Sequence, residues 1–303
     1  MKGKITRRLV RWWKEVAWKY ILRCARWWKE VGWKHLLALV LMVYCVFPLL
    51  YVVSASLNPG GTISGSSELF RIVSPENYGT LLGTNFPRWM LQSLVISTTT
   101  AIGTVLMAAS AAYAFSRYRF TGRRGGLTAL MLVQMFPQML AFVAIFLLLL
   151  MLRDIYPVLG LDSAFGLIAI YLGGALGGNT FLIYGFFNTI PKELDEAARI
   201  DGASHAQIFW GVIMRLVTPI LVVVGLLSFV SSYGDFILAK VVLQSPENYT
   251  LAVGMYVWAS DERNAPWSLY AAGAVVAATP IILLFMYLQK YIVAGLTAGA
   301  VKG

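Results

Sequence analysis

Few residues in this sequence have the types and spacing that covalent chemistry needs. The chain contains two cysteines, Cys24 and Cys45, and two histidines, His35 and His205, and these four residues form no metal-ligand pattern. The G-x-x-x-x-G-K-[ST] motif, whose backbone cradles nucleotide phosphates, does not occur in the sequence. We therefore predict no catalytic residue and no metal or cofactor site on this chain, so that any chemical energy must come from a separate subunit.

A second group of residues could contact a ligand without reacting with it, because these residues are polar and lie inside long apolar runs. Gln134 and Gln138 bracket a proline, whose missing N–H should kink a helix there. Asn179 and Asp235 lie in the next two apolar runs. Such side chains are costly against lipid and tend to face a cavity or another helix, which makes them candidates for a translocation path. Hydrogen bonds that only hold helices together explain each of them equally well, and Asp235 could instead pair with Lys240.

Four glycines within one apolar run resemble a phosphate-binding loop only superficially. They are Gly173, Gly174, Gly177 and Gly178. Small residues inside a membrane span allow two helices to approach closely, so we predict that these glycines serve helix packing.

The elements that carry these residues are predicted to be membrane-spanning helices. Hydrophobic residues make up 58% of the chain and charged residues only 13%, which is far from the composition of a soluble domain. A bilayer needs about 20 apolar residues per helical span. Six runs approach this length, at 36–57, 89–115, 127–152, 166–189, 217–243 and 269–293. The short alternating segments of a membrane barrel are not visible. The predicted fold is therefore all-α, with six transmembrane helices.

The basic residues predict how these helices are oriented. Twenty of the 25 Lys and Arg residues fall in the first 35 residues, the 116–126 loop, the segment around 190–216 and the C-terminal end, which all lie on one side of the six spans. Positive residues are retained on the cytoplasmic side. We therefore expect a multi-pass protein of the cell membrane with both termini in the cytoplasm. The net charge of +11 follows from this topology and from lipid headgroups, and needs no nucleic acid partner.

The N-terminal segment, residues 1–35, contains a near-repeat. RWWKEVAWK at 11–19 returns as RWWKEVGWK at 26–34, an offset of fifteen residues that is close to four helical turns. Aromatic and apolar residues then share one face of a helix while Lys and Arg cover the rest, as in helices that lie on membrane lipid. A tandem duplication without a separate function is the alternative. The six spans form the main domain, 36–293, and residues 294–303 form a cytoplasmic tail.

The segment at about 190–216 is predicted to be a short polar helix-turn-helix between the fourth and fifth spans. Pro191 suits a first helical turn, and the acidic residues Glu193, Asp195 and Glu196 favour the positive end of a helix. Gly202 should end this helix. Ser204 and Gln207 have the spacing of a capping box, so a second helix should begin at His205 and run toward Arg215. An ordered helix pair outside the membrane is suited to docking a soluble partner.

This segment resembles the EAA loop of the membrane permeases of ATP-binding-cassette (ABC) importers, whose E-A-A-x-x-x-G pattern it carries from Glu196 to Gly202. The resemblance implies a type I importer permease fold and a coupling helix that contacts an ATPase. It assigns that contact to Glu196, Ala197, Ala198, Asp201, Gly202 and Ala203. One position departs from the pattern, because Arg215 replaces the proline that ends the second helix. Pro219, four residues later, could supply the break.

From about residue 36 the chain resembles sugar-importing permeases, and within them the maltose and maltodextrin group. The C-terminal sequence GLTAGAVKG is similar to the tail that reaches the ATPase interface in that group, which implies this contact for Thr297, Ala298, Gly299, Lys302 and Gly303. The segment Gln244–Trp267 resembles a loop that enters the sugar-binding protein, which implies that contact for Asn248, Tyr249, Thr250 and Gly254. QMFPQ at 134–138 and LGG at 172–174 also fit the group.

The resemblance implies a permease subunit that imports maltose or maltodextrin-type oligosaccharides by alternating access. The implied partners are a second, homologous permease subunit, a homodimer of the ATPase that binds ATP and Mg, and an extracytoplasmic sugar-binding protein. Sugar contacts in the group lie mainly on the other permease subunit. A trehalose or other oligosaccharide importer is the alternative within the class, and an ATP-independent secondary transporter is the alternative outside it.

Overall fold

The computed structural model describes residues 26–59, 69–260 and 265–298, and every regular element within these ranges is a helix. The chain divides into two compact units, Met1–Ser54 and Ala55–Gly303. Of the described helices, four are individually long and apolar enough to cross a membrane, and the number rises to six if each of two bent helix pairs is one span.

The first span-length helix begins earlier than the sequence predicts. A π-helical turn, η1 (Trp28–Gly32), runs directly into α2 (Trp33–Ser56), giving 29 continuous helical residues. The second copy of the near-repeat is thus joined to the span, because no helix-breaking residue separates them. Gly32 lies in this turn close to the Trp28 ring, where a Cβ atom would come within 2.6 Å of it. Residues 11–25, which hold the first copy, lie outside the described residues.

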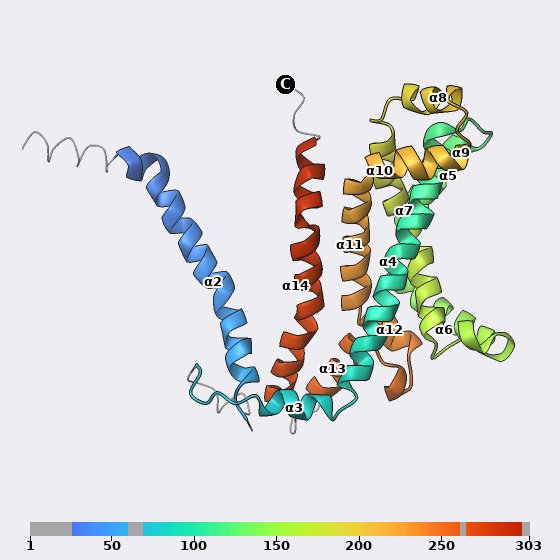
Figure 1. The fold of residues 1–303 in the computed structure, drawn as a ribbon. Helices are drawn as coiled ribbons and strands as arrows, with labels where there is room; N and C mark the ends of the chain where they lie inside the picture. Colours follow the sequence, from blue (N-terminus) through green and yellow to red (C-terminus); the bar gives the residue numbers. More distant parts are fainter. Residues whose placement is uncertain (1–25, 60–68, 261–264, 299–303) are drawn as a thin grey trace, which may run out of the picture. The chain divides into compact units, whose positions relative to one another are not determined.

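The core of the second unit is built around α4 (Phe86–Arg117), which packs against α7 (Ala164–Phe187) and α11 (Thr218–Gly234) (Figure 1). α14 (Trp267–Ala298) packs against α11. The face of α4 that is buried in this bundle is lined by small residues at helical spacing: Ser93, Ser97, Thr100, Ala101, Thr104, Ala108, Ala109 and Ala112. Small side chains let helix backbones approach closely. α4 has 32 residues and is therefore about 48 Å long at 1.5 Å per residue.

The third predicted span, 127–152, is broken into two helices. α5 (Arg123–Gln134) and α6 (Gln138–Ile155) flank the break, and the pair is bent by 98°. Pro137 lies at the break in an extended conformation, with φ −63° and ψ 108°. The predicted kink is confirmed, but it is sharp enough to end one helix and begin another.

The fifth predicted span, 217–243, is also shorter than expected. α11 ends at Gly234, Asp235 is extended, and a separate short helix, α12 (Ile237–Val242), follows. The Asp235 carboxylate accepts a hydrogen bond from the N–H of Ala239 at 3.0 Å, which satisfies a backbone donor at the start of α12. The polar residue that marks this run therefore interrupts the helix.

Short helices gather at the two ends of the bundle. α3 (Glu76–Leu82), η5 (Pro246–Asn248) and α13 (Leu251–Ala259) contact the N-terminal end of α4, and we call this the loop end. α8 (Glu193–Ile200) lies at the opposite end, which we call the EAA end (Figure 1). The two predicted partner-binding regions are thus separated by the length of the bundle.

Candidate functional site

The segment 190–216 forms the predicted helix pair at the EAA end. α8 carries Glu193, Asp195 and Glu196 in its first turn, as expected for the positive end of a helix. After the turn, α9 (His205–Gln207) continues through a π-helical stretch, η4 (Ile208–Ile213), and α10 (Met214–Leu216).

The turn between the two helices depends on Gly202. Its φ of +84° lies in the left-handed region, which glycine adopts without a steric penalty. The Gly202 N–H donates to the Arg199 carbonyl at 3.0 Å, and the Ala203 N–H donates to the Ala198 carbonyl at 2.9 Å. These two bonds form a Schellman motif, which satisfies the free carbonyls at the end of α8. The predicted role of Gly202 as a helix stop is confirmed.

The start of the second helix is the predicted capping box. The Ser204 N–H donates to Gln207 Oε1 at 2.7 Å, and the Gln207 N–H donates to Ser204 Oγ at 3.3 Å. The end of this helix also follows the sequence. With Arg215 in place of the family proline, the break falls at Val217, and Pro219 lies just after it in the first turn of α11; the two segments are bent by 79°.

The EAA residues divide between two faces of the helix pair. Glu196, Ala197, Asp201 and Gly202 are exposed, whereas Ala198 and Ala203 pack against a buried cluster below the pair. Ile200, which the sequence analysis did not select, projects from the outer face with 87% of its surface exposed. Trp210 is also exposed, at 55%. The surface that a partner could reach therefore combines a carboxylate, small residues and two large apolar side chains.

The cluster below the pair joins it to the bundle. Ile208, Phe209 and Ile213 of η4 are buried against α4 and α7 residues, and the Phe209 ring lies 5.0 Å from that of Tyr113 on α4. Burial of large apolar side chains of this kind is worth about 1.5–3 kcal/mol each. The helix pair is thus packed onto the bundle as a folded unit.

A buried ion pair reinforces this attachment. The Nε atom of Arg117, in the last turn of α4, lies 2.6 Å from Oδ2 of Asp195 in α8, and the two side chains are only 3% and 6% exposed. The Arg117 Nη2 also donates to the Ile190 carbonyl at 3.2 Å. Sequence reasoning treated Arg117 as a topology signal and Asp195 as a helix-end charge. No signal near either residue in the sequence indicates that the two would meet, because they are 78 positions apart.

At the loop end, the predicted binding-protein residues lie mostly inside the fold. Tyr249, Thr250 and Gly254 are buried, and only Asn248 of the four is partly exposed. The Tyr249 ring faces Lys240, whose Nζ lies 4.7 Å from the ring centroid. Gln244, Pro246 and Glu247 are exposed on this turn, where a partner could reach them, while the buried residues hold the loop in place.

Asp162, in the connection between α6 and α7, fixes the same loop. Its Oδ1 accepts hydrogen bonds from the N–H groups of Gln244 and Ser245 at 2.8 and 3.0 Å, and its Oδ2 accepts one from Ser245 Oγ at 2.5 Å. Asn248 Nδ2 donates to the Asp162 carbonyl at 3.1 Å. Burial disfavours the ionised carboxylate, but the hydrogen bonds from Ser245, Gln244 and Asn248 outweigh it, so the pKa of Asp162 falls below its usual value.

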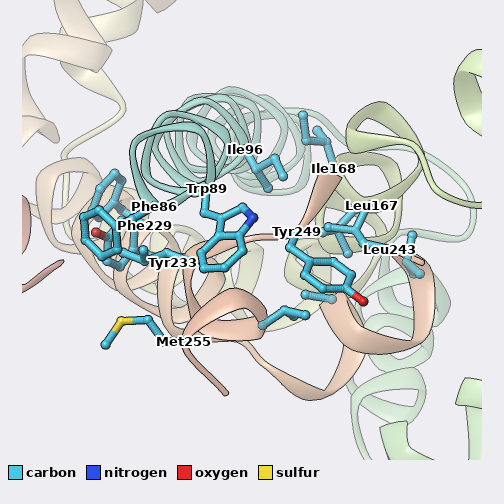
Figure 2. Close-up of a cluster of buried hydrophobic side chains, with 14 of the residues drawn as sticks. Phe86, Trp89, Ile96, Leu167, Ile168, Phe229, Tyr233, Leu243, Tyr249 and Met255 are labelled. Atoms are coloured by element: carbon cyan, nitrogen blue, oxygen red, sulfur yellow. The ribbon is translucent and has the colours of Figure 1, made fainter. Parts of the chain in front are cut away.

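Trp89 of α4 attaches this loop to the bundle. Its Nε1 donates to the Pro246 carbonyl at 2.8 Å, and Ser93 one turn later accepts the Leu251 N–H at 2.7 Å. Figure 2 shows Trp89 at the centre of the buried cluster, with Tyr249 to one side and Tyr233 to the other. Gly254 lies directly against the Trp89 ring, so that no Cβ atom would fit there.

Three of the four polar candidates for a translocation path have defined neighbours in the described chain, and these neighbours differ. Gln134 lies against Gly177 and Gly178 of α7, where a Cβ atom would meet its side chain at 2.7 and 2.8 Å. The packing role predicted for the glycines is thus confirmed at these two, although a Cβ atom at Gly173 would meet no neighbour.

The other candidates have different surroundings. Asn179 donates to the Ala175 carbonyl of its own helix at 2.8 Å. Asp235 accepts from the Tyr171 hydroxyl at 2.8 Å, while Lys240 donates to the Tyr249 hydroxyl at 3.3 Å, so the pairing of Asp235 with Lys240 is not formed between these described residues. The backbone at Gln138 begins α6.

The predicted tail lies largely beyond the described chain. Thr297 and Ala298 are the last residues of α14, and Gly299, Lys302 and Gly303 lie outside the described residues. In the part of the chain that the structure describes, no group of three or more His, Cys, Asp or Glu residues could hold a metal ion.

Comparisons with known proteins agree on one family. Residues 104–298 match the family model described as "binding-protein-dependent transport system inner membrane component". The chain is 39% identical over 265 residues to the galactooligosaccharides transport system permease protein GanQ of Bacillus subtilis, covering 86% of this chain and 92% of the relative. It is 38% identical over 264 residues to the maltodextrin permease MdxG of the same organism, covering 87% and 93%. It is 38% identical over 279 residues to the maltose/maltodextrin permease MalG of Salmonella typhimurium, covering 88% and 93%.

Solved structures share the fold. A chain from a bacterial ABC transporter involved in the import of the acidic polysaccharide alginate superposes with a TM-score of 0.75 at 24% identity, covering 88% of this chain and 98% of that one. A chain from the alginate transporter in complex with its alginate-bound periplasmic protein superposes with a TM-score of 0.54 at 16% identity, covering 87% and 96%.

Proposed function

This chain belongs to the family of binding-protein-dependent transport system inner membrane components, and from that premise we propose that it is one of two different permease subunits in an ATP-driven importer of maltodextrin-type oligosaccharides. Members of this family are non-catalytic, multi-pass membrane subunits of ABC transporters, so the alternative of an ATP-independent secondary transporter is wrong. ATP and Mg would then bind to a partner ATPase, present in two copies.

The observation that carries the proposal is the exposed face of the EAA helix pair. Glu196, Ala197 and Gly202 face outward on a helix pair whose other face is anchored by an ion pair and a buried apolar cluster. A surface held rigidly to the bundle can pass a partner's movement to the spans, whereas a frayed loop could not. We propose that Asp201 and Ile200 join these residues in contacting the ATPase, and that Ala198 and Ala203 support the contact from below.

The proposed topology has six spans with both termini in the cytoplasm. The broken pair α5–α6 serves as the third span and α11 as the fifth. The basic residues Arg119, Arg123 and Arg124 near the EAA end support a cytoplasmic position for it, because positive residues are retained on that side. The C-terminal end of α14 lies at the same end of the unit as α8 (Figure 1), which agrees with a tail, Thr297–Gly303, that reaches the ATPase.

The loop end would then face the extracytoplasmic sugar-binding protein. Pro246 and Glu247 are exposed on a turn that Asp162 and Trp89 fix from two sides. A loop fixed in advance loses little conformational entropy when it binds, which favours its use as a docking element. We propose that Gln134 and Gln138, at the break between α5 and α6, line the translocation path.

The names of the relatives support maltodextrin as the transported sugar, and they also give a second candidate substrate. Two of the relatives described above are named for maltose or maltodextrin transport, and one of similar identity is named for galactooligosaccharides. Both are neutral oligosaccharides, so the choice depends on the sugar units and on the linkage between them. Trehalose remains a further alternative.

The test uses the complete transporter, assembled with its own second permease, ATPase and binding protein in proteoliposomes. Maltodextrins of increasing length, galactooligosaccharides and trehalose are offered separately, and sugar uptake and ATP hydrolysis are measured together. We expect maltodextrins to drive both activities. Stimulation by galactooligosaccharides alone would assign the second substrate class, and uptake that continues without ATP would contradict the proposed mechanism.

A further inference from the structure

The Arg117–Asp195 ion pair connects two elements that the chain itself does not connect. α8 follows α7 through the short segment 188–192, so the covalent chain links the EAA helix pair to α7. Arg117 belongs to α4, which lies far earlier in the sequence. The ion pair, the bond from Arg117 Nη2 to the Ile190 carbonyl at 3.2 Å and the bond from Ser116 Oγ to Asn188 Oδ1 at 2.9 Å all tie α4 to this region.

The surroundings of the pair make it hard to break. Both side chains are almost fully buried, so separating the charges would leave each one without water or a partner. Neither Asp195 Oδ1 nor Arg117 Nε has a hydrogen-bond partner among the described residues, so the attraction between the two opposite charges is what offsets the burial of this carboxylate. If α8 is displaced, the end of α4 should therefore move with it, because the ion pair would otherwise have to break.

α4 is suited to carry such a displacement across the bundle. It is one helix from Phe86 to Arg117, about 48 Å long, whereas α5–α6 and the entry to α11 are bent by 98° and 79°. At its far end, Trp89 and Ser93 hydrogen-bond to the backbone at Pro246 and Leu251, on either side of the proposed docking loop. One rigid helix thus has polar anchors to both partner-facing regions.

We propose that α4 is the transmission helix of this subunit and that the Arg117–Asp195 ion pair is the joint through which the EAA helix pair moves it. Closure of the ATPase then shifts α8, the ion pair draws the end of α4, and the anchors at Trp89 and Ser93 move the outer loop. Arg117 and Asp195 act as positioning residues. This inference rests on the proposed function, because it assumes that the EAA pair docks on an ATPase.

The test separates coupling from folding by measuring sugar imported per ATP hydrolysed in the assembled transporter. Asp195→Asn keeps the size of the side chain and removes its charge. We expect this variant to lower the ratio by at least about fivefold, the lower end of usual coupling between sites. The charge exchange Arg117→Asp with Asp195→Arg should recover part of the loss, because the attraction returns with its partners reversed.

Arg123→Gln is the matched control. Arg123 also lies at the EAA end, but its side chain donates at 3.1 Å to the hydroxyl of Tyr184, which belongs to α7 and not to α8. This variant should leave the ratio unchanged. If Asp195→Asn prevents assembly, Arg117→Gln decides, because it removes the other charge of the pair and should lower the ratio by a similar factor. A parental ratio in the assembled Asp195→Asn or Arg117→Gln transporter would overturn the joint.

Failure of the joint can be distinguished from failure of the proposed function. Glu196→Lys alters only the exposed docking face. If Glu196→Lys uncouples transport while Asp195→Asn does not, the EAA assignment stands and the joint is wrong. If neither variant changes the ratio, the EAA assignment itself is wrong.

Discussion

Gly202 shows how one residue can set the geometry of the proposed docking surface through its backbone alone. A Cβ atom at this position would meet no neighbour within 4 Å, so the only obstacle to a side chain is the φ of +84°. A non-glycine residue in the left-handed region costs roughly 1–2 kcal/mol. The residue is therefore required by the turn and not by packing.

We accordingly expect Gly202→Val to weaken assembly with the ATPase and to reduce sugar uptake, while the chain still inserts in the membrane, because a β-branched residue does not tolerate the left-handed region. Gly211→Val is the matched control, because Gly211 lies in the second helix, has open space around its Cβ position and has no left-handed φ. Copurification of the ATPase from detergent-solubilised membranes measures the effect. Equal recovery of the ATPase with both variants would contradict the idea that the turn at Gly202 is needed for ATPase binding.

Asp162 acts at the same scale on the other side of the molecule. Its pKa is lowered in the folded protein by the hydrogen bonds that it accepts. A carboxylate with a lowered folded-state pKa stabilises the structure above its unfolded pKa of about 4, and this contribution is lost as the pH falls through the folded-state value. The loop should therefore be held firmly at neutral pH and released only in acid.

We predict that the backbone amide hydrogens of Gln244 and Ser245, which donate to Asp162, exchange slowly with solvent near neutral pH. In acid their protection factors should fall, after correction for the pH dependence of the intrinsic exchange rate. Asp162→Asn should weaken protection at neutral pH and remove its dependence on this titration, since asparagine also tolerates the φ of 64° found here. Hydrogen exchange followed by mass spectrometry measures both. Glu247→Gln, on the exposed turn, is the control and should behave like the parent.

At the scale of elements, α13 is seated on α4 through the contact between Gly254 and Trp89. Trp89 also lies 5.1 Å from the Trp258 ring, so its side chain is held on two sides. Added atoms in a filled core usually cost about 1–3 kcal/mol. The absence of a side chain at Gly254 is thus what allows the two helices to touch.

We expect Gly254→Ala to lower the midpoint of thermal unfolding of the purified complex and to shift the fluorescence of the displaced tryptophan. Gly79→Ala tests the same substitution in α3, where nothing lies within 4 Å, and there alanine should be neutral or slightly stabilising because it favours helix. An unchanged midpoint for Gly254→Ala would mean that Trp89 can move aside at no cost.

At the scale of the whole molecule, the proposed function requires parts at opposite ends of the bundle to act together with partners. Removing residues 297–303 deletes two residues of α14 and the tail beyond it, and none of the six proposed spans loses apolar length. We expect normal insertion but lower sugar-stimulated ATP hydrolysis, because the tail's proposed contact with the ATPase is lost. Deletion of the same number of residues from the N-terminus is the control, and normal hydrolysis by the C-terminal truncation would contradict the proposal.

Several features were predictable from the sequence because they depend on neighbouring residues. The turn at Gly202, the capping box from Ser204 to Gln207 and the breaks at Pro137 and just before Pro219 each follow from backbone chemistry within a few positions. The apolar runs likewise predict helices, because a bilayer requires apolar length and internal hydrogen bonding. The EAA spacing was enough to indicate the family, since its residues are contiguous.

Only the tertiary structure decided the contacts between residues that lie far apart in the chain. Nothing near Asp195 in the sequence points to Arg117, and nothing near Asp162 points to Ser245, because such pairs form only when separate helices pack. The same reason explains why Tyr249 and Gly254 lie under Trp89 and not on the surface. The sequence by itself determined the helices and their turns through local bonding, and packing decided which of their residues hold the bundle and which are left to meet a partner.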